Sequence, residues 1–105
     1  MDANPIALLV DDEPASRAAQ QTRLEDQGYT VFVALDQADA VSRAKQTAPK
    51  VIFAHLGASS LGNLALIQAL RSEDACRHIP VVVITDHTQV GVKPTKLRAV
   101  PHDSW

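Results

Sequence analysis

The stretch IALLVDDEPASR, residues 6–17, combines the two signals that decide the fold of this chain. Its first part, residues 6–10, is a continuous apolar run, which is typical of a strand covered on both faces of a sheet. An acidic segment follows, and then Pro14, whose missing N–H suits the first turn of a helix. Gly28 is placed to end that helix at Gln27 in a left-handed conformation. We therefore expect a buried strand that leads directly into a helix.

The same strand–helix order recurs along the chain. Strands are predicted where β-branched and apolar residues cluster, and helices where a cap or a helical spacing of apolar residues follows. Repeated strand–helix units joined by short loops predict an α/β fold, a parallel sheet with helices on both faces. The further strands are expected over 29–35, 51–56 and 81–85, and the further helices from Asp36 to just before Pro49 and over 64–71, with a loop over 57–63.

The first helix is expected to have a weak apolar face. Polar residues occupy positions where a longer apolar stripe would normally lie. We therefore expect a modest core and modest stability. The expected inward residues are Ala15, Ala18 or Ala19, Thr22 and Leu24.

Composition excludes several classes of protein. The 105 residues suffice for one small domain. A net charge of -2 gives no electrostatic reason to expect nucleic acid or an anionic membrane as a partner, and the apolar runs are far too short to cross a bilayer. The first residues lack the basic region of a secretory signal. Cys76 is the only cysteine, which we interpret as an inert, partly buried thiol, and a reducing cytoplasm is the expected compartment.

Polar side chains follow three of the predicted strands. In an open parallel α/β sheet, ligands bind beyond the carboxyl ends of the strands. Asp11 and Asp12 follow the first strand, His55 ends the third, and Thr85 ends the fourth. We expect these side chains to converge on one crevice.

Four blocks of sequence carry a family resemblance: LLVDDEPASR, GYTVFVALDQADAV, APKVIFAHL and LIQALRSEDACRHIPVVVIT. From about Ile6 to Thr85 the chain resembles the receiver domain of two-component response regulators. The resemblance implies a flavodoxin-like (CheY-like) fold, in which a histidine kinase transfers a phosphoryl group to an Asp at the end of the third strand. It also implies that Asp11 and Asp12 help to hold Mg²⁺, and that the Thr85 hydroxyl contacts the phosphoryl group.

Three departures from the receiver pattern concern the site itself. His55 stands at the acceptor position, and imidazole neither forms an acyl phosphate nor supplies the oxygen ligand that Mg²⁺ prefers. The loop after it, GASSLGN, has no proline where receivers usually carry a Pro and a Gly. Asp86 follows Thr85 and would repel an anionic phosphoryl donor. Mg²⁺ is therefore the only cofactor that the resemblance implies, and we expect it to bind more weakly than at an intact site.

The fourth departure is the short C-terminal part. The chain ends 20 residues after Thr85, whereas a parallel crossover needs a dozen or more residues between strands, usually including a helix. Lys93 and Pro94 look like the Lys-Pro after a receiver's fifth strand, but they follow too soon for that route. Lys93 is thus either a displaced switch lysine or a chance match. We expect a receiver-like domain over 1–88 with its last helices missing, and an irregular or disordered tail over 89–105.

An incomplete sheet of this kind would leave the fourth strand, VVVIT, as an apolar edge. Exposed apolar edges recruit other chains. We therefore expect self-association through the fourth-strand edge, or a protein partner that covers it.

Three roles stay open for His55. It can be a neutral replacement that hydrogen-bonds to Asp11 or Asp12, a nitrogen ligand in a divalent-metal site with both aspartates, or a phosphohistidine. Nucleophilic catalysis through Ser59 or Ser60 is disfavoured, because the spacing supplies neither an oriented base nor an oxyanion hole.

The leading hypothesis is a receiver-like signalling domain, not an enzyme, that is not phosphorylated at the usual position because His55 replaces the acceptor Asp. It would act by protein–protein contact in a two-component phosphorelay, with a histidine kinase or another signalling protein as partner and without nucleic acid or membrane. Three alternatives stay open: a divalent-metal or pH-sensing module built on Asp11, Asp12 and His55, a still active phosphoacceptor, and a decayed gene product without function.

Overall fold

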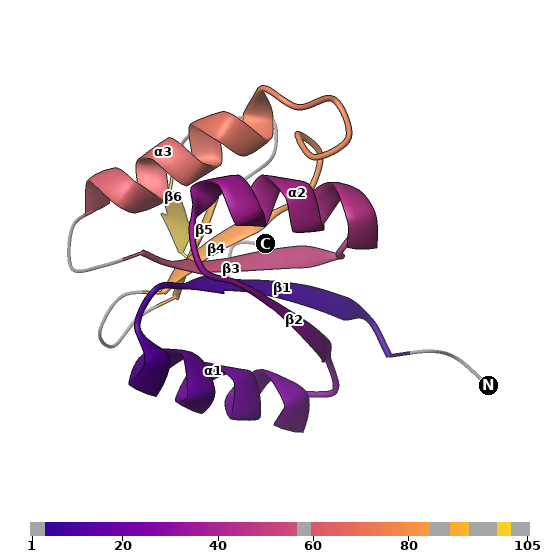
Figure 1. The fold of residues 1–105 in the computed structure, drawn as a ribbon, viewed down its shortest axis with the longest axis vertical. Coiled ribbons are helices and arrows are strands. Elements are labelled where there is room, and N and C mark those ends of the chain that lie inside the picture. The colour runs from indigo at the N-terminus through magenta and orange to yellow at the C-terminus, as the bar shows by residue number, and fades with distance from the viewer. Residues whose placement is uncertain (1–3, 57–59, 85–88, 93–98, 102–105) are drawn as a thin grey trace.

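The computed structural model describes residues 4–56, 60–84, 89–92 and 99–101. Its centre is one sheet of strands in the order β2-β1-β3-β4-β5-β6, and the described helices pack against it (Figure 1). The elements are β1 (Ile6–Asp11), α1 (Pro14–Asp26), β2 (Thr30–Ala34), α2 (Gln37–Thr47), β3 (Val51–His55), α3 (Ser60–Arg71), β4 (Val81–Ile84), β5 (Gln89–Val92) and β6 (Ala99–Pro101).

The first four strands form the parallel sheet that the sequence predicts. β1 pairs in parallel with β2 and β3, and β3 pairs in parallel with β4. Residues 7–10 of the apolar run in β1 are fully buried, with Leu8 and Leu9 on opposite faces. α1 covers the face of Leu9, whereas α2 and α3 cover the face of Leu8 (Figure 1). An α/β fold with helices on both faces is therefore confirmed.

The inward face of α1 differs from the prediction. Leu24 is the only buried residue of this helix, and its half-buried side chains are polar ones, among them Arg17 and Gln20. The prediction fails because the apolar signal along α1 is too weak to define an inward face, while Ser16 and Arg17 orient the helix by bonding to Asp11. The small residues that we expected inside are exposed: Ala15, Ala18, Ala19 and Thr22.

α3 begins earlier than predicted. It starts at Ser60, so the expected loop over 57–63 is wrong for its last four residues. The Asn63 side chain is turned back to accept a hydrogen bond from the Leu56 N–H. Gly62 allows the first turn to approach the chain closely, because a Cβ there would lie 3.2 Å from the Leu56 carbonyl oxygen. The glycine and asparagine that suggested a loop thus belong to the helix.

The sheet continues beyond β4 in the opposite direction. β5 pairs antiparallel with β4, so that Ile84 faces Gln89 and Val81 faces Val92, and β6 pairs antiparallel with β5. An antiparallel neighbour needs only a few connecting residues, whereas a parallel one needs a crossover. The expected irregular tail is therefore wrong for the residues of β5 and β6. The expected exposed edge at β4 is also wrong, because β5 covers it.

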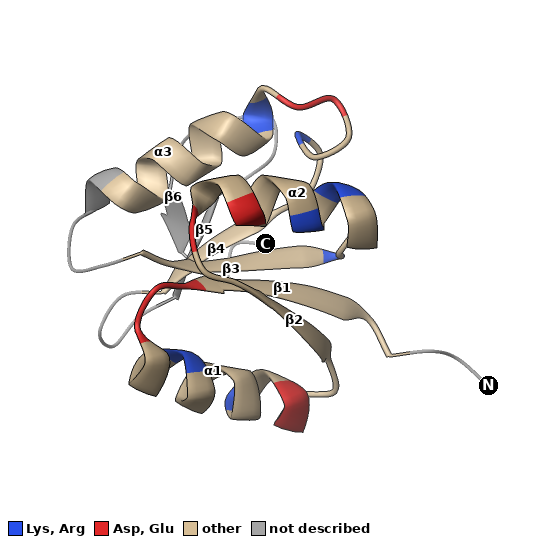
Figure 2. Ribbon diagram, viewed as in Figure 1, with Lys and Arg blue, Asp and Glu red and all other residues tan. Residues whose placement is uncertain are grey.

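Charged residues lie mainly on the helices and connections, while the central strands carry few (Figure 2). This distribution follows from the helices that cover both faces of the strands. Within the part of the chain that the structure describes, no helix has the length and apolar character needed to cross a membrane.

Candidate functional site at the carboxyl ends of the strands

The parallel register places Asp11 and His55 side by side. The two residues are partners across β1 and β3 and end their strands together. The Nδ1 atom of His55 lies 3.3 Å from the Oδ2 atom of Asp11. The Asp11 side chain is fully buried, while that of His55 is 21% exposed. A buried carboxylate therefore faces an imidazole that keeps some contact with solvent.

Asp11 joins the end of β1 to the start of α1. Its Oδ1 atom accepts a hydrogen bond from the Glu13 N–H at 2.9 Å, the local pattern by which Asp favours turns. Its Oδ2 atom accepts a hydrogen bond from the Ser16 hydroxyl at 2.8 Å. The Arg17 guanidinium donates to the Asp11 carbonyl oxygen at 3.2 Å. Both carboxylate oxygens are thus satisfied within the chain, as a buried carboxylate requires.

Ser16 connects the carboxylate to the imidazole. Its Oγ atom lies 3.2 Å from the Nδ1 atom of His55 while it donates its proton to Asp11. A hydroxyl has one proton, so the Ser16 oxygen can only accept from Nδ1, which must carry a proton. This assignment follows from the hydrogen-bond network. In a neutral ring the Nε2 atom is then left as an acceptor.

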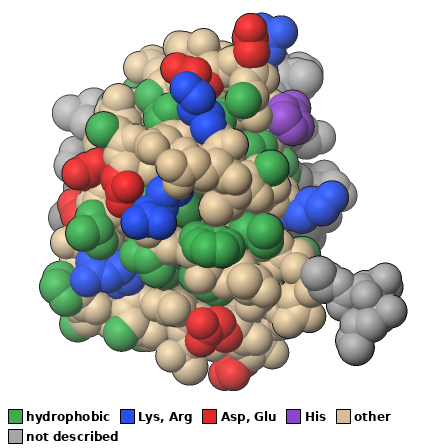
Figure 3. Space-filling model, turned by 45° about the vertical axis from the view of Figure 1, so that its right-hand side comes forward, with side chains coloured by type: hydrophobic (Ala, Val, Ile, Leu, Met, Phe, Trp, Pro, Cys, Tyr) green, Lys and Arg blue, Asp and Glu red, His purple; other side chains and the backbone are tan. Residues whose placement is uncertain are grey.

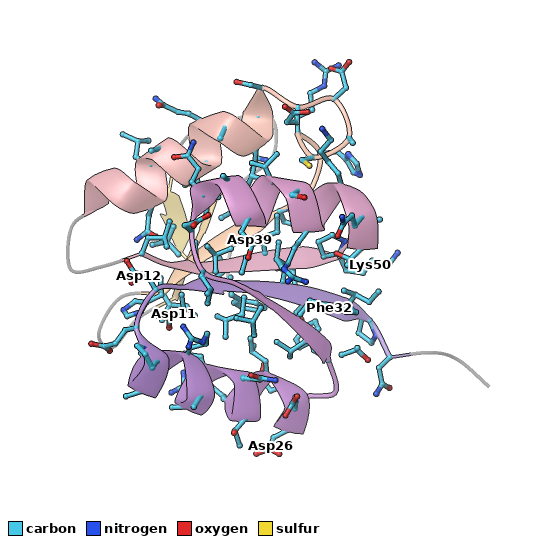
Figure 4. All side chains as sticks on the ribbon, viewed as in Figure 1. Asp11, Asp12, Asp26, Phe32, Asp39 and Lys50 are labelled. Atoms are coloured by element: carbon cyan, nitrogen blue, oxygen red, sulfur yellow. The ribbon has the colours of Figure 1, made fainter. Side chains whose placement is uncertain are left out.

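Asp12 is the second position that the family resemblance assigns to the metal. It lies one residue beyond β1 and is exposed, and Figure 4 shows Asp11 and Asp12 on different sides of the end of β1. Figure 2 shows the same acidic segment in red at the turn from β1 into α1. Among the described residues, no group of three or more His, Cys, Asp and Glu side chains is arranged to hold a metal ion.

The residues present do not fit a Mg²⁺ site. Both oxygens of Asp11 already accept hydrogen bonds from Glu13 and Ser16, and position 55 offers a nitrogen. Mg²⁺ requires nearly octahedral oxygen ligands and dehydrates reluctantly. A metal would therefore have to displace the hydrogen bonds that hold Asp11.

Asn63 joins the first turn of α3 to the residue that follows β3. This side chain is buried, and its Oδ1 atom accepts a hydrogen bond from the Leu56 N–H at 2.8 Å. The contact fixes the chain directly after His55 against the first turn of α3. It therefore fixes the position of Leu56, the residue that follows His55, relative to α3.

The sequence did not single out Ser16 or Asn63. The signal for Ser16 lies in its place in the first turn of a helix that directly follows an acidic strand end. The signal for Asn63 is a polar residue that precedes the apolar run of α3. Neither signal is decisive before the strand register is known. The remaining predicted positions lie outside the residues that the structure describes: Ser59, Thr85, Asp86, Lys93 and Pro94. The side chain of Ser60 is also not described.

Cys76 lies in the connection between α3 and β4, which leads into the amino end of β4, whereas the candidate site lies at the carboxyl ends of the strands. Its side chain is fully buried, more than the partial burial expected. Burial raises the pKa of the thiol, the charge of Glu73 raises it further, and Lys45 acts in the opposite direction. A thiol that keeps its proton is a weak nucleophile, which agrees with an inert role.

The fold and this site define the class of the protein. A parallel α/β sheet carries an acidic residue at the end of its first strand and a polar residue beside it at the end of its third. The sequence profile of the response regulator receiver domain matches residues 7–102. The chain belongs to the response regulator receiver family, as its sequence blocks predict.

Curated relatives share the family but are longer. The chain is 29% identical over 101 residues to the transcriptional regulatory protein PrrA of Mycobacterium leprae, covering 96% of this chain and 42% of the relative. It is 31% identical over 90 residues to the probable transcriptional regulator ycf27 of Porphyridium aerugineum, covering 86% of this chain and 36% of the relative. The chain thus spans less than half the length of these two regulators.

Solved structures share the fold. The Vibrio cholerae chemotaxis protein CheY4, crystallised at low pH, has a TM-score of 0.71 and 26% identity, covering 82% of this chain and 72% of that one. The receiver domain of the sensor histidine kinase PA1611 from Pseudomonas aeruginosa has a TM-score of 0.70 and 22% identity, covering 81% and 70%. In that protein a magnesium ion is coordinated in the active-site cleft.

Proposed function

We propose that this chain is a receiver-type signalling module that is not phosphorylated at position 55 and acts by binding a protein partner. The observation that carries the proposal is the closed network of Asp11, Ser16 and His55 at the place where receivers react. A receiver's acyl phosphate forms on a carboxylate, and the β3 strand end has none. The module would have no enzymatic activity of its own and would work in the cytoplasm.

The network supports this proposal because His55, at the position of the acceptor carboxylate, takes part in contacts with Asp11 and Ser16 within the chain. In a receiver, two or more carboxylates near one another need a cation to offset their repulsion. Here the partner of Asp11 is an imidazole 3.3 Å away, and a serine hydroxyl completes the contact. The buried acid is thus satisfied without a metal, and the fold can be kept as a docking surface.

The direction of β5 supports the same proposal. In the receivers that the chain resembles, the fifth strand is parallel and brings a lysine to the phosphoryl group. Here β5 is antiparallel to β4, and its last residue, Val92, pairs with Val81, the first residue of β4. The strand therefore ends at the amino edge of the parallel strands, away from His55.

The test is a titration of the purified chain by two-dimensional NMR. Mg²⁺ is added first and beryllofluoride second, while intact mass is followed after exposure to acetyl phosphate. We expect no shift at Asp11, Asp12 or His55, and no mass gain of a phosphoryl group. The matched control is His55→Asp, which restores a carboxylate at the end of β3 and should bind Mg²⁺ measurably.

Each contrary outcome identifies an alternative. Beryllofluoride shifts or phosphorylation in the wild-type chain would mean that the phosphoacceptor is active, and the proposal would be wrong. Shifts of Asp11, Asp12 and His55 with Mn²⁺ or Zn²⁺ alone would favour a metal sensor. A spectrum without dispersed signals would show that the chain does not fold alone. That outcome would favour a decayed gene product without function.

A further inference from the structure

The open edge of the sheet at β2 is the feature on which this inference rests. Among the strands that the structure describes, β2 is the outermost on its side of the sheet and pairs with β1 alone. Its sequence, TVFVA, is rich in β-branched and aromatic residues and contains neither a charge nor a proline. Natural proteins usually protect such edges with Lys, Pro or a bulge. The other edge of the sheet, β6, has three residues and includes Pro101, which lacks an N–H.

The backbone groups that point outward from β2 can be assigned. The Thr30 N–H donates to the Pro5 carbonyl oxygen at 2.8 Å, so the backbone groups of Thr30 point towards β1. Backbone groups alternate in direction along a strand, so Phe32 shares this direction. Val31 and Val33 therefore present their N–H and C=O groups to the open edge.

The open stretch has defined ends. The Tyr29 N–H is already bonded to the Leu24 carbonyl oxygen. The Leu35 N–H is bonded to the Asp39 carboxylate. The backbone N–H and C=O groups that can pair with an added strand are therefore those of Val31 and Val33, and Phe32 lies between them.

We propose that β2 pairs antiparallel with β2 of a second copy of this chain, around a two-fold axis at Phe32. In this register Val31 faces Val33 of the second copy, and each such pair exchanges two backbone hydrogen bonds. Phe32 then faces Phe32 of the second copy as a non-hydrogen-bonded pair, in which side chains are closest. The two sheets become one continuous sheet.

The side chains of this edge suit a second copy. A two-fold interface brings the same surface together with itself, so the surface must be self-complementary. β2 is uncharged along its whole length, so two copies meet without like-charge repulsion within the strand. Phe32 lies on the face of Leu8, its partner in β1, and is 36% exposed; Leu35, just beyond the strand, is 50% exposed. Figure 3 shows, on the face that it presents, hydrophobic side chains that reach the surface amid charged ones.

The experiment measures mass by sedimentation velocity as the protein concentration is raised to the millimolar range. The wild-type chain should shift from 11.3 kDa towards twice that mass. Phe32→Lys should stay a monomer, because two lysines would face each other directly. The matched control is Leu64→Lys, which charges another exposed apolar side chain, on α3, and should dimerise as the wild type does.

A mixed sample keeps the proposal falsifiable if the lysine variant folds poorly. Phe32→Lys and Phe32→Glu should each be monomeric, and their mixture should restore the dimer, since opposite charges then face each other. Hydrogen exchange at Val31 and Val33 should slow with concentration in the wild type. A wild type that stays at 11.3 kDa overturns the proposal, and protection of these amides in such a monomer would assign the edge to another occupant. Equal dimerisation of Phe32→Lys and wild type would also overturn it.

Discussion

The Nδ1 atom of His55 lies 3.3 Å from the Oδ2 atom of the fully buried Asp11, across the paired ends of β3 and β1. This contact occupies the position at which a receiver would hold two carboxylates. Because one partner is an imidazole that can donate a proton, the pair is attractive where two carboxylates would repel. The site is thus held by its own hydrogen bonds.

Ser16→Ala should lower the free energy of unfolding by about 1–3 kcal/mol, since the buried Oδ2 atom of Asp11 loses its shortest hydrogen bond. Urea denaturation measures this loss. Ser42→Ala, which removes an exposed hydroxyl on α2, is the control and should change stability little. Equal effects of the two substitutions would show that the Ser16 bond contributes nothing specific.

Asn63→Ala should destabilise the chain by about 1–3 kcal/mol, because the Leu56 N–H would lose its acceptor beside the first turn of α3. Thermal and urea unfolding both report this change. Asn63→Asp keeps an oxygen at the same place and adds a negative charge to the first turn of a helix, which is favourable. It should therefore retain most of the stability, and a loss as large as that of the alanine variant would refute the role of the bond.

Two residues with positive φ angles should respond in opposite directions. Gly28 has a φ of 100°, so Gly28→Ala should cost about 1 kcal/mol through backbone strain. Ala48 has a φ of 47°, and Ala48→Gly should relieve strain at the end of α2 and gain up to about 1 kcal/mol. Calorimetric unfolding of both variants beside the wild type is the measurement. A change in the same direction for both would contradict the assignment of strain.

The Cys76 thiol should make stability fall at high pH. Its pKa is raised in the folded chain by burial and by Glu73, so the unfolded chain loses this proton first, at about its ordinary value of 9.0. The folded state then binds more protons than the unfolded state, and its advantage is lost as the pH rises above 9.0. The difference in unfolding free energy between wild type and Cys76→Ala should shrink over that range in urea titrations. A difference that stays constant with pH would show that the thiol titrates alike in both states.

The parallel part of the fold follows from the sequence because its signals are local. The apolar run of β1, the proline at the start of α1 and the glycine after it each specify structure within a few residues. The β4–β5 hairpin could not be derived in the same way, because the family pattern called for a crossover and the segment QVGV is too short to decide between directions. Its antiparallel register is a property of tertiary pairing.

The candidate site was predicted in part. The convergence of Asp11 and His55 is confirmed, because parallel strands place their carboxyl ends at one edge. Ser16 was missed, because its role depends on the phase of α1, and that phase is set by polar contacts rather than by an apolar stripe. A hydrophobic pattern cannot indicate a helix face that is held by hydrogen bonds.

The single buried residue of α1 has a dynamic consequence. Leu24 lies near the end of this helix, while its beginning is held to the sheet through Ser16 and Arg17. Local opening costs least where few apolar contacts must be broken. The amides of α1 should therefore exchange with solvent by partial unfolding, ahead of those of β1. Each such event would carry Ser16 away and admit water to Asp11, so the lifetime of the hydrogen-bonded site is the lifetime of the docked helix.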